Sequence, residues 1–307
     1  MRVLVTGGSG FIGSHLVEQL QGSAEVRVLD NLRSGNRENL DGLRCEFISG
    51  SILDRDVVRE AVQGVDYVFH LAALVSVPES MQTPVACAEI NTLGTLVLLE
   101  EARQAGVKKM VFSSSAAIYG NNHVTPKIET MLPEPRSPYA ISKLDGEYYC
   151  NLFAEQGWLP TTCLRYFNVF GPRQDPASQY AAAIPIFIER MLKDEPVTIY
   201  GDGSQTRDFI SVKDVAAANL FFAAERSCSG VFNVACGQKI TILELAEAIR
   251  KFTNSRSEIR FAAERAGDVK HSLASIEKTR QVGFSPHARF LDALRMTVEA
   301  FVQQQIA

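Results

Sequence analysis

The stretch that decides the fold opens the chain and reads Met1-Arg2-Val3-Leu4-Val5-Thr6-Gly7-Gly8-Ser9-Gly10-Phe11-Ile12-Gly13. A β-branched apolar run leads directly into glycines at positions 7, 10 and 13, and a helix-period segment follows. In a G-x-x-G-x-x-G turn between a strand and a helix, backbone N–H groups can approach a pyrophosphate, whose charge is favoured by the helix N-terminus. The strand before the turn and the helix after it weaken the alternative of a plain glycine-rich turn. The stretch therefore predicts the first βα unit of a dinucleotide-binding domain.

Short strand patterns alternate with helical patterns through the first half of the chain. We expect strands near 2–6, 25–30, 45–49, 66–71, 108–113 and 161–165, and helices near 11–21, 54–63, 84–105 and 138–156. This order is typical of right-handed βαβ units and of a parallel sheet with helices on both faces. The predicted fold class is α/β, with a doubly wound parallel Rossmann sheet.

The alternation loosens after Gly171-Pro172. We expect helices near 180–193, 213–225, 241–252 and 288–304, and short strands near 197–200 and 207–210. These elements predict a smaller α+β substrate-binding lobe over the carboxyl ends of the strands, where open α/β sheets bind ligands. The predicted division gives residues 1–170, with a returning segment near 205–236, to the dinucleotide-binding domain, and 171–204 with 237–307 to the lobe.

The bulk composition argues against several classes of protein. The chain has 307 residues and a formal net charge of -4, so it lacks the basic excess that binds nucleic acid or an anionic membrane. Its six cysteines show no C-x-x-C pair and no metal-ligand spacing, so we interpret them as reduced core residues and predict no metal site. No apolar stretch approaches bilayer length and no signal peptide precedes the glycine turn, so we expect a cytoplasmic protein.

Asp30 ends the second predicted strand, about twenty residues after the glycine turn. A carboxylate at this place accepts hydrogen bonds from the adenosine ribose and repels a 2′-phosphate, so it favours NAD over NADP. Arg33 supports the competing NADP hypothesis, because a guanidinium can pair with that phosphate. A further alternative is that Asp30 is a turn residue beside Asn31 and Gly35.

A candidate catalytic site consists of residues at the start of one helix and at the end of one strand. Tyr139 and Lys143 form Y-x-x-x-K, and this spacing puts both on one helix face, where the ammonium is expected to lower the pKa of the phenol. The fifth predicted strand ends in Ser113-Ser114-Ser115, at the carboxyl edge of the sheet. Either signal alone is weak, since such pairs arise by chance and serines cap turns. In order after the glycine turn, they predict a Ser/Tyr/Lys site.

The whole chain resembles the extended short-chain dehydrogenases/reductases, specifically nucleotide-sugar epimerases of the UDP-glucose/UDP-N-acetylglucosamine 4-epimerase type. The motifs that carry the resemblance are Thr6 to Gly13, His70-Leu71-Ala72-Ala73, Asn91 before Gly94-Thr95, Ser113-Ser114-Ser115, Tyr139 to Lys143, Leu164-Arg165-Tyr166-Phe167-Asn168 and Arg207-Asp208-Phe209. The resemblance implies an NAD-dependent isomerase in which Tyr139 is the general base and acid on the sugar O4. Ser115 would hydrogen-bond the same oxygen, and Lys143 would bind the nicotinamide ribose and hold Tyr139 ionised. Hydride would leave C4 for NAD and return to the other face of a 4-keto sugar.

The same resemblance implies two sets of contact residues. The cofactor set is Gly7, Gly10, Phe11, Ile12, Gly13, Asp30, Asn31, Ser34, Gly35, Ser51, Ile52, Leu71, Ala72, Ala73, Asn91, Tyr139, Lys143 and Phe167. The substrate set is Ser115, Tyr139, Asn168, Ala183, Tyr200, Arg207, Arg265, Asp268 and Ser272. Two positions depart from the family pattern: Ser51 replaces an Asp that bonds the adenine, and Val75 replaces a Lys of some UDP-glucose epimerases. The resemblance also implies a homodimer formed through the helices near 84–105 and 138–156.

The segments 171–185 and 267–273 resemble epimerases of UDP-N-acetylglucosamine and UDP-N-acetylgalactosamine. Ser272 falls where enzymes restricted to UDP-glucose carry a bulky tyrosine, so it leaves room for an acetamido group. Activity on UDP-glucose and UDP-galactose stays open, because lost packing contacts cost only about 1–3 kcal/mol. The alternatives are a UDP-glucose-only 4-epimerase, a nucleotide-sugar dehydratase or reductase, and a non-catalytic NAD or nucleotide-sugar binding protein. Ala116 and Ala117 stand where related dehydratases carry acidic residues, which disfavours the dehydratase.

Overall fold

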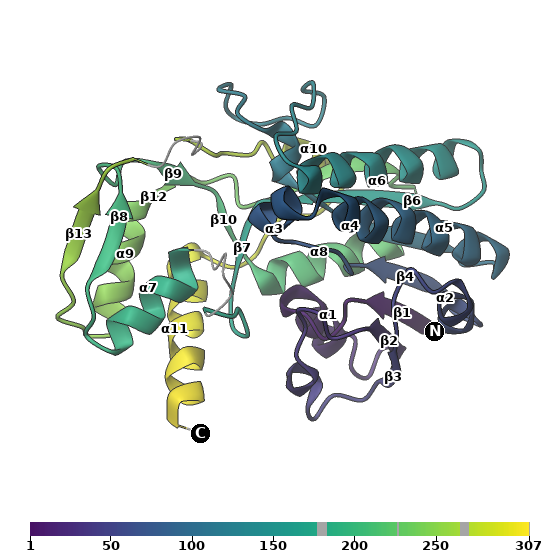
Figure 1. The fold of residues 1–307 in the computed structure, drawn as a ribbon, viewed down its shortest axis with the longest axis horizontal. Coiled ribbons are helices and arrows are strands. Elements are labelled where there is room, and N and C mark those ends of the chain that lie inside the picture. Colours follow the sequence, from purple (N-terminus) through teal and green to yellow (C-terminus); the bar gives the residue numbers. More distant parts are fainter. Residues whose placement is uncertain (177–182, 226, 265–269, 307) are drawn as a thin grey trace.

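A seven-stranded parallel sheet forms the larger part of the protein. The structure is a computed structural model that describes residues 1–176, 183–225, 227–264 and 270–306. The strand order is β11-β6-β5-β4-β1-β2-β3, and each pairing within this sheet is parallel. The strands are β1 (Arg2–Thr6), β2 (Glu25–Asp30), β3 (Glu46–Ser49), β4 (Tyr67–His70), β5 (Lys109–Ser115), β6 (Thr161–Tyr166) and β11 (Gly230–Val234). Helices cover the sheet (Figure 1), and the predicted doubly wound Rossmann fold is confirmed.

The apolar strand sequences bury both faces of the sheet. Val3 and Val5 pack into a core layer with α1 (Phe11–Gln19) and α8 (Val212–Ala224). Leu4 packs into the opposite layer with α2 (Arg55–Val62), α5 (Gly94–Gln104) and α6 (Pro138–Glu155). Successive side chains of a strand point to opposite faces, so a continuous apolar run is what a strand covered on both sides requires. Each fully buried aliphatic side chain of this kind contributes about 1.5–3 kcal/mol.

The helix predicted at 84–105 is interrupted in the structure. It consists of α4 (Pro84–Ala88), a π-helical turn η2 (Glu89–Leu93) and α5. The turn brings the amide of Asn91 to Leu74, whose N–H donates to Oδ1 at 2.7 Å and whose carbonyl accepts from Nδ2 at 3.0 Å. Nδ2 also donates to Ser142 Oγ at 2.9 Å. A π turn adds a residue to the helix, and these bonds stabilise it here.

The second half of the chain forms a smaller lobe, on the left in Figure 1. It contains α7 (Ala183–Leu192), β8 (Val197–Tyr200), α9 (Ile242–Phe252), β13 (Ile259–Ala262) and α11 (Phe290–Ile306). Phe187, Leu245 and Leu294 are among the buried side chains of its own core, and β8 pairs with β13 in parallel. The predicted substrate lobe therefore exists as a packed unit, while its bounds in the sequence stay a prediction.

The single strand predicted at 207–210 is wrong, because the structure divides it at Asp208. β9 (Thr206–Arg207) pairs with β12 (Ile240–Thr241), whereas β10 (Phe209–Ser211) pairs with β7 (Asn168–Phe170). The buried Asp208 carboxylate accepts hydrogen bonds from the backbone N–H groups of Cys236, Gly237 and Ala274 at 3.0–3.1 Å. These bonds hold the chain at the point where it passes from one strand partner to another.

Several short elements were not predicted. They are β7, β11, β12, β13, α3 (Val77–Gln82) and α10 (Glu277–Gln281). Each has six residues or fewer, which is too short for a helical or strand period to stand out. The helix expected at 180–193 begins at Ala183 among the described residues, and its first predicted positions lie outside them.

Candidate active site

A cleft of about 710 Å³ opens at the carboxyl ends of the central strands. The strand order reverses there, because β1 lies between β2 and β4. Open α/β sheets bind ligands at such a switch point. The glycine turn after β1, the loop after β2, the segment after β4 and the end of β5 all line the cleft.

The glycines of the turn allow the backbone to come close to its neighbours. Gly7 has φ +70°, and a Cβ there would lie 2.7 Å from the backbone nitrogen of Ala72. A Cβ on Gly13 would lie 2.2 Å from the carbonyl oxygen of Gly7. Helix α1 begins at Phe11 with Gly10 as its N-cap, and no side chain caps it. Its first N–H groups are therefore available to an anion, and the helix dipole favours negative charge at this place.

Asp30 is held at the end of β2 with little solvent access. Its Oδ2 accepts from the backbone N–H of Ser9 at 2.9 Å, and Oδ1 accepts from Leu32 at 2.8 Å. Because an ionised carboxylate has about four lone-pair sites, it can still accept from ribose hydroxyls. The guanidinium of Arg33 makes an ion pair of 2.6 Å with Glu79 of α3. The positive charge that would support NADP is thus already engaged by a carboxylate.

Another residue of the cleft lining also fits bound NAD. Gln174 lines the cleft, and its Oε1 is buried without a hydrogen-bond partner among the described residues. Buried acceptors of this kind cost free energy unless a ligand or water satisfies them. A glycine cradle, an open helix N-terminus and a carboxylate at the end of β2 together suit a dinucleotide.

The helix that carries Tyr139 and Lys143 starts beside the end of β5. Ser137 caps α6 by accepting from the N–H of Ala140 at 3.2 Å, and Pro138 takes the first helical position. Lys143 Nζ donates to the carbonyl of Ser113 at 2.7 Å and lies 5.9 Å from the centre of the Tyr139 ring. Ser115, Tyr139 and Lys143 all line the cleft, so the structure brings the predicted trio together.

The pKa of Tyr139 differs in direction from the prediction. Burial raises the pKa of the phenol, and a hydrogen bond with Ser115 opposes that rise. Burial also lowers the pKa of Lys143, to about 8. The net direction is therefore opposite to the predicted one, because desolvation of the phenolate dominates and the Lys143 ammonium donates to the Ser113 carbonyl.

Most predicted cofactor residues line the cleft, and Asn91 does not. Those that line it are Gly7, Gly10, Phe11, Ile12, Gly13, Asp30, Asn31, Ser34, Gly35, Ser51, Ile52, Leu71, Ala72, Ala73, Tyr139, Lys143 and Phe167. Asn91 is 3% exposed and bonds Leu74 and Ser142, so it supports the wall of the cleft from behind.

The predicted substrate residues of the second lobe that the structure describes are not part of the lining of this cleft. Asn168 Nδ2 donates to the carbonyl of Asp208 at 3.1 Å, and Arg207 Nη1 donates to that of Thr206 at 3.0 Å. The N–H of Ser272 also donates to the Thr206 carbonyl, so Ser272 lies beside β9. Ala183 begins α7, and Tyr200 ends β8. Arg265 and Asp268 lie outside the described residues, so these substrate roles remain predictions.

Sequence reasoning missed part of the cleft wall. The missed residues are Leu29, Gly50, Leu74, Ser76, Glu79, Ile90, Tyr166, Val169, Gln174 and Asp175. Leu29, Leu74, Ser76 and Tyr166 lie at or just after strand carboxyl ends, which is a signal that could have found them. Ile90 reaches the cleft from the π turn, which has no signal in the hydrophobic period.

No described helix has both the length and the apolar composition to cross a membrane. Within the described part of the chain, no three His, Cys, Asp or Glu side chains gather as metal ligands.

Comparisons with known proteins agree with this geometry. A model of the NAD dependent epimerase/dehydratase family matches residues 3–235. The chain is similar to a UDP-N-acetylglucosamine 4-epimerase from Methanobrevibacter ruminantium, solved with UDP-N-acetylmuramic acid (44% identity, TM-score 0.95, 99% of this chain and 98% of that one). It is also similar to a UDP-glucose 4-epimerase from Thermotoga maritima, solved with UDP-glucose (42%, TM-score 0.94, 99% and 100%). A third solved relative is a UDP-glucose 4-epimerase from Thermus thermophilus in complex with NAD (41%, TM-score 0.89, 98% and 99%).

Proposed function

Since the chain belongs to the NAD-dependent epimerase/dehydratase family, we propose that it is a UDP-hexose 4-epimerase that accepts the N-acetylated pair UDP-N-acetylglucosamine and UDP-N-acetylgalactosamine. The observation that carries the proposal is the meeting of Ser115, Tyr139 and Lys143 in one cleft with the glycine turn and Asp30. The solved relatives, which are named as 4-epimerases of either UDP-N-acetylglucosamine or UDP-glucose, support the reaction class without choosing the sugar.

In this proposal Tyr139 moves the proton of the sugar O4. NAD, when bound, supplies the acceptor for the C4 hydride and a positive ring that favours a phenolate nearby. Tyr139 takes the O4 proton as C4 is oxidised and returns it when the same hydride comes back to the other face of the ketone. Protons and electrons balance over the cycle, so no external oxidant or reductant is consumed.

Ser115 and Lys143 assist through hydrogen bonds and charge. Ser115 lies close enough to Tyr139 to oppose the rise in the pKa of the phenol, and it would hydrogen-bond the sugar O4. The Lys143 ammonium, with a pKa of about 8, is mostly protonated at neutral pH and can donate to a ribose hydroxyl. General acid–base catalysis of this kind contributes about 10²–10⁴-fold.

The choice of an N-acetylated sugar depends on Ser272 and on Ala183 at the start of α7. Both are small side chains, and Ser272 lies beside β9, which also carries Arg207. Asn168, Arg207, Arg265 and Asp268 are proposed to hold the diphosphate and the uridine, because arginines donate two permanently charged hydrogen bonds to phosphate.

The test is C4 inversion followed by proton NMR, with UDP-N-acetylglucosamine and UDP-glucose as separate substrates and no added reductant. Inversion of the acetylated sugar would support the full proposal. Turnover of UDP-glucose alone would keep the reaction and refute the sugar choice. Failure with both sugars, even after NAD is added, would refute the 4-epimerase assignment.

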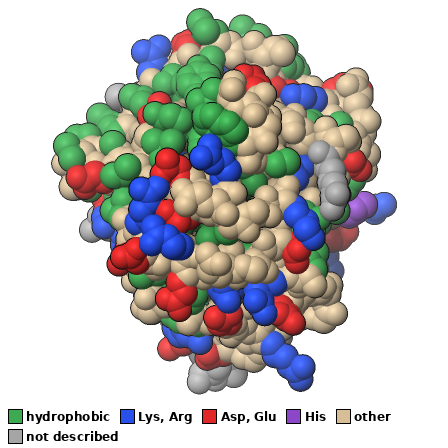
Figure 2. Space-filling view, turned by 90° about the vertical axis from the view of Figure 1, so that its right-hand side faces the viewer, with side chains coloured by type: hydrophobic (Ala, Val, Ile, Leu, Met, Phe, Trp, Pro, Cys, Tyr) green, Lys and Arg blue, Asp and Glu red, His purple; other side chains and the backbone are tan. Residues whose placement is uncertain are grey.

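We also propose that the protein is a homodimer that pairs through the helix of α4, η2 and α5 and through α6. Exposed apolar side chains on these helices support this, namely Val85, Leu93, Ile141, Tyr148 and Leu152. Figure 2 shows hydrophobic side chains gathered on the upper left of the face that it draws. Sedimentation equilibrium of the wild type and of Leu152→Glu would test the dimer.

A cytoplasmic location is also proposed, because all six cysteines are free.

A further inference from the structure

We infer that Glu147, acting with Arg165, is a positioning residue that holds the carboxyl end of β5 in register with α6. The inference rests on the proposed function and deepens it, because that strand end carries Ser115 and the carbonyl that holds Lys143. The link between the buried ion pair and the strand end is the hydroxyl of Ser114.

One face of α6 meets three consecutive serines of β5. Tyr139, Lys143 and Glu147 are four residues apart and therefore lie along one side of the helix. The Ser113 carbonyl accepts from Lys143 Nζ at 2.7 Å, and Ser114 Oγ donates to Glu147 Oε1 at 2.6 Å. Ser113 and Ser114, the two residues that precede Ser115, are thus hydrogen-bonded to the helix.

The helix backbone lies close against the strand at this level. A Cβ on Gly146 would lie 2.3 Å from Cζ of Phe112, so the residue beside Glu147 must be small. Phe112 and Ser114 are two residues apart on β5 and share a face, which is the face toward α6. A small shift of Ser114 is therefore passed directly to Ser115, the next residue along the same strand.

Arg165 fixes the carboxylate to which Ser114 donates. It lies on β6 in register with Ser114, and its Nε and Nη2 donate to Glu147 at 2.8 and 2.7 Å. The Arg165 and Glu147 side chains are 4% and 2% exposed. The guanidinium also lies 4.8 Å from the centre of the Tyr119 ring. A buried ion pair is weak evidence for stability, but a bidentate pair packed on all sides admits one geometry.

Replacing Glu147 by glutamine tests this role. The amide keeps the size of the side chain, but it turns an NH₂ group toward the guanidinium and loosens the bond to Ser114. Because small misplacements of reacting groups cost up to about 100-fold, we expect kcat to fall about 10–100-fold in Glu147→Gln. The KM for the UDP-sugar and the dissociation constant of NAD should stay within about threefold, since binding groups are left in place.

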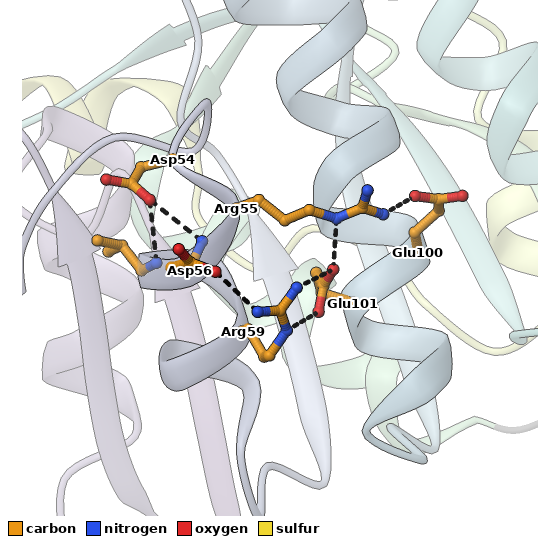
Figure 3. Close-up of polar contacts among 7 residues, drawn as sticks. Asp54, Arg55, Asp56, Arg59, Glu100 and Glu101 are labelled. Atoms are coloured by element: carbon orange, nitrogen blue, oxygen red, sulfur yellow. Dashed lines mark hydrogen bonds and ion pairs between the residues drawn. The ribbon is translucent and has the colours of Figure 1, made fainter.

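Glu101→Gln is the matched control. Glu101 of α5 is also 2% exposed, and it accepts from Arg55 and Arg59 of α2 at 2.7 and 3.1 Å (Figure 3). The substitution removes a buried carboxylate charge beside two arginines and leaves the contacts at the end of β5 unchanged. We expect this variant to melt at a lower temperature than the wild type and to keep the wild-type kcat, measured well below both melting temperatures.

Ser114→Ala gives a second measurement if Glu147→Gln does not fold. It leaves the ion pair intact and removes only the link to the strand, so kcat should fall with little change in melting temperature. The emission spectrum of bound NADH is a readout independent of turnover, because it responds to the polar groups around the nicotinamide. It should shift in Glu147→Gln and Ser114→Ala, and not in Glu101→Gln.

The inference is overturned if Glu101→Gln loses as much kcat as Glu147→Gln. It is equally overturned if Ser114→Ala keeps both the wild-type kcat and the wild-type NADH emission. A wild type that inverts no UDP-hexose would count against the proposed function alone, and the NADH spectra of the three variants would then decide the inference.

Discussion

His70 should make the protein lose stability between pH 6.5 and pH 3 by an amount that can be worked out from its surroundings. The ring is 1% exposed, and burial, with the Lys143 charge as a lesser cause, lowers its pKa from 6.5 to about 3. Thr95 Oγ1 donates to the Asn91 carbonyl at 2.5 Å, so it accepts from His70 Nε2 at 2.9 Å. Nδ1 is then the acceptor for Thr6 Oγ1 at 2.7 Å, and the site is satisfied by a neutral imidazole.

The sign follows from the lower pKa in the folded state. Above pH 6.5 the ring is neutral in both states and costs nothing. Below pH 6.5 the unfolded chain binds a proton at His70 and the folded protein does not, so the free energy of unfolding falls as the pH falls. Each pH unit is worth about 1.4 kcal/mol, so lowering the pH from 7 to 5 should remove about 2 kcal/mol, and the full loss near pH 3 is about 5 kcal/mol.

Urea unfolding of the wild type and of His70→Gln, at pH 7 and pH 5, measures this contribution. The variant should be less stable at pH 7, because its amide cannot reproduce both hydrogen bonds. Its loss between pH 7 and pH 5 should nevertheless be about 2 kcal/mol smaller than that of the wild type. His123→Gln is the control, because His123 is exposed and its loss should leave the wild-type difference. Identical pH differences in the wild type and His70→Gln would refute the reasoning.

Gly13→Ala would place a Cβ 2.2 Å from the Gly7 carbonyl oxygen, so the glycine turn must open. NADH fluorescence titration should then show an affinity for NADH that is at least about tenfold weaker. An unchanged affinity would contradict the packing. Tyr139→Phe keeps the ring and removes the proton carrier, so kcat measured by NMR should fall about 10²–10⁴-fold with NAD binding retained. A Tyr139→Phe variant with the wild-type kcat would exclude Tyr139 as the base. Ser272→Tyr should lower kcat/KM for UDP-N-acetylglucosamine relative to UDP-glucose by about tenfold or more, and an unchanged ratio would remove Ser272 from the sugar pocket.

The sequence predicted the parts of the structure that depend on local pattern. The strand Arg2–Thr6, the glycine turn and the Y-x-x-x-K helix were predictable because each combines a period with a residue type that its position demands. The alternation of strands and helices was then enough to place Gly7, Asp30 and Ser115 at one edge of the sheet.

The parts that escaped prediction depend on contacts distant in the sequence. The π turn at Asn91 is stabilised by Leu74 and Ser142, and the break at Asp208 by N–H groups of residues 236, 237 and 274. The raised pKa of Tyr139 could not be predicted for a different reason. A four-residue spacing indicates that two side chains share a helix face, but it says nothing about how deeply each is buried or which carbonyl holds the lysine.

The last strand of the sheet also has a consequence for synthesis on the ribosome. β6 ends at Tyr166, and its outer edge is covered only when β11, at Gly230–Val234, pairs with it. At about 5–20 residues per second, the nascent chain carries that open edge for several seconds. An unpaired strand edge is a template for pairing with other chains. Codon choice and chaperone supply over residues 167–234 should therefore influence the yield of native protein more strongly than the same changes after residue 240.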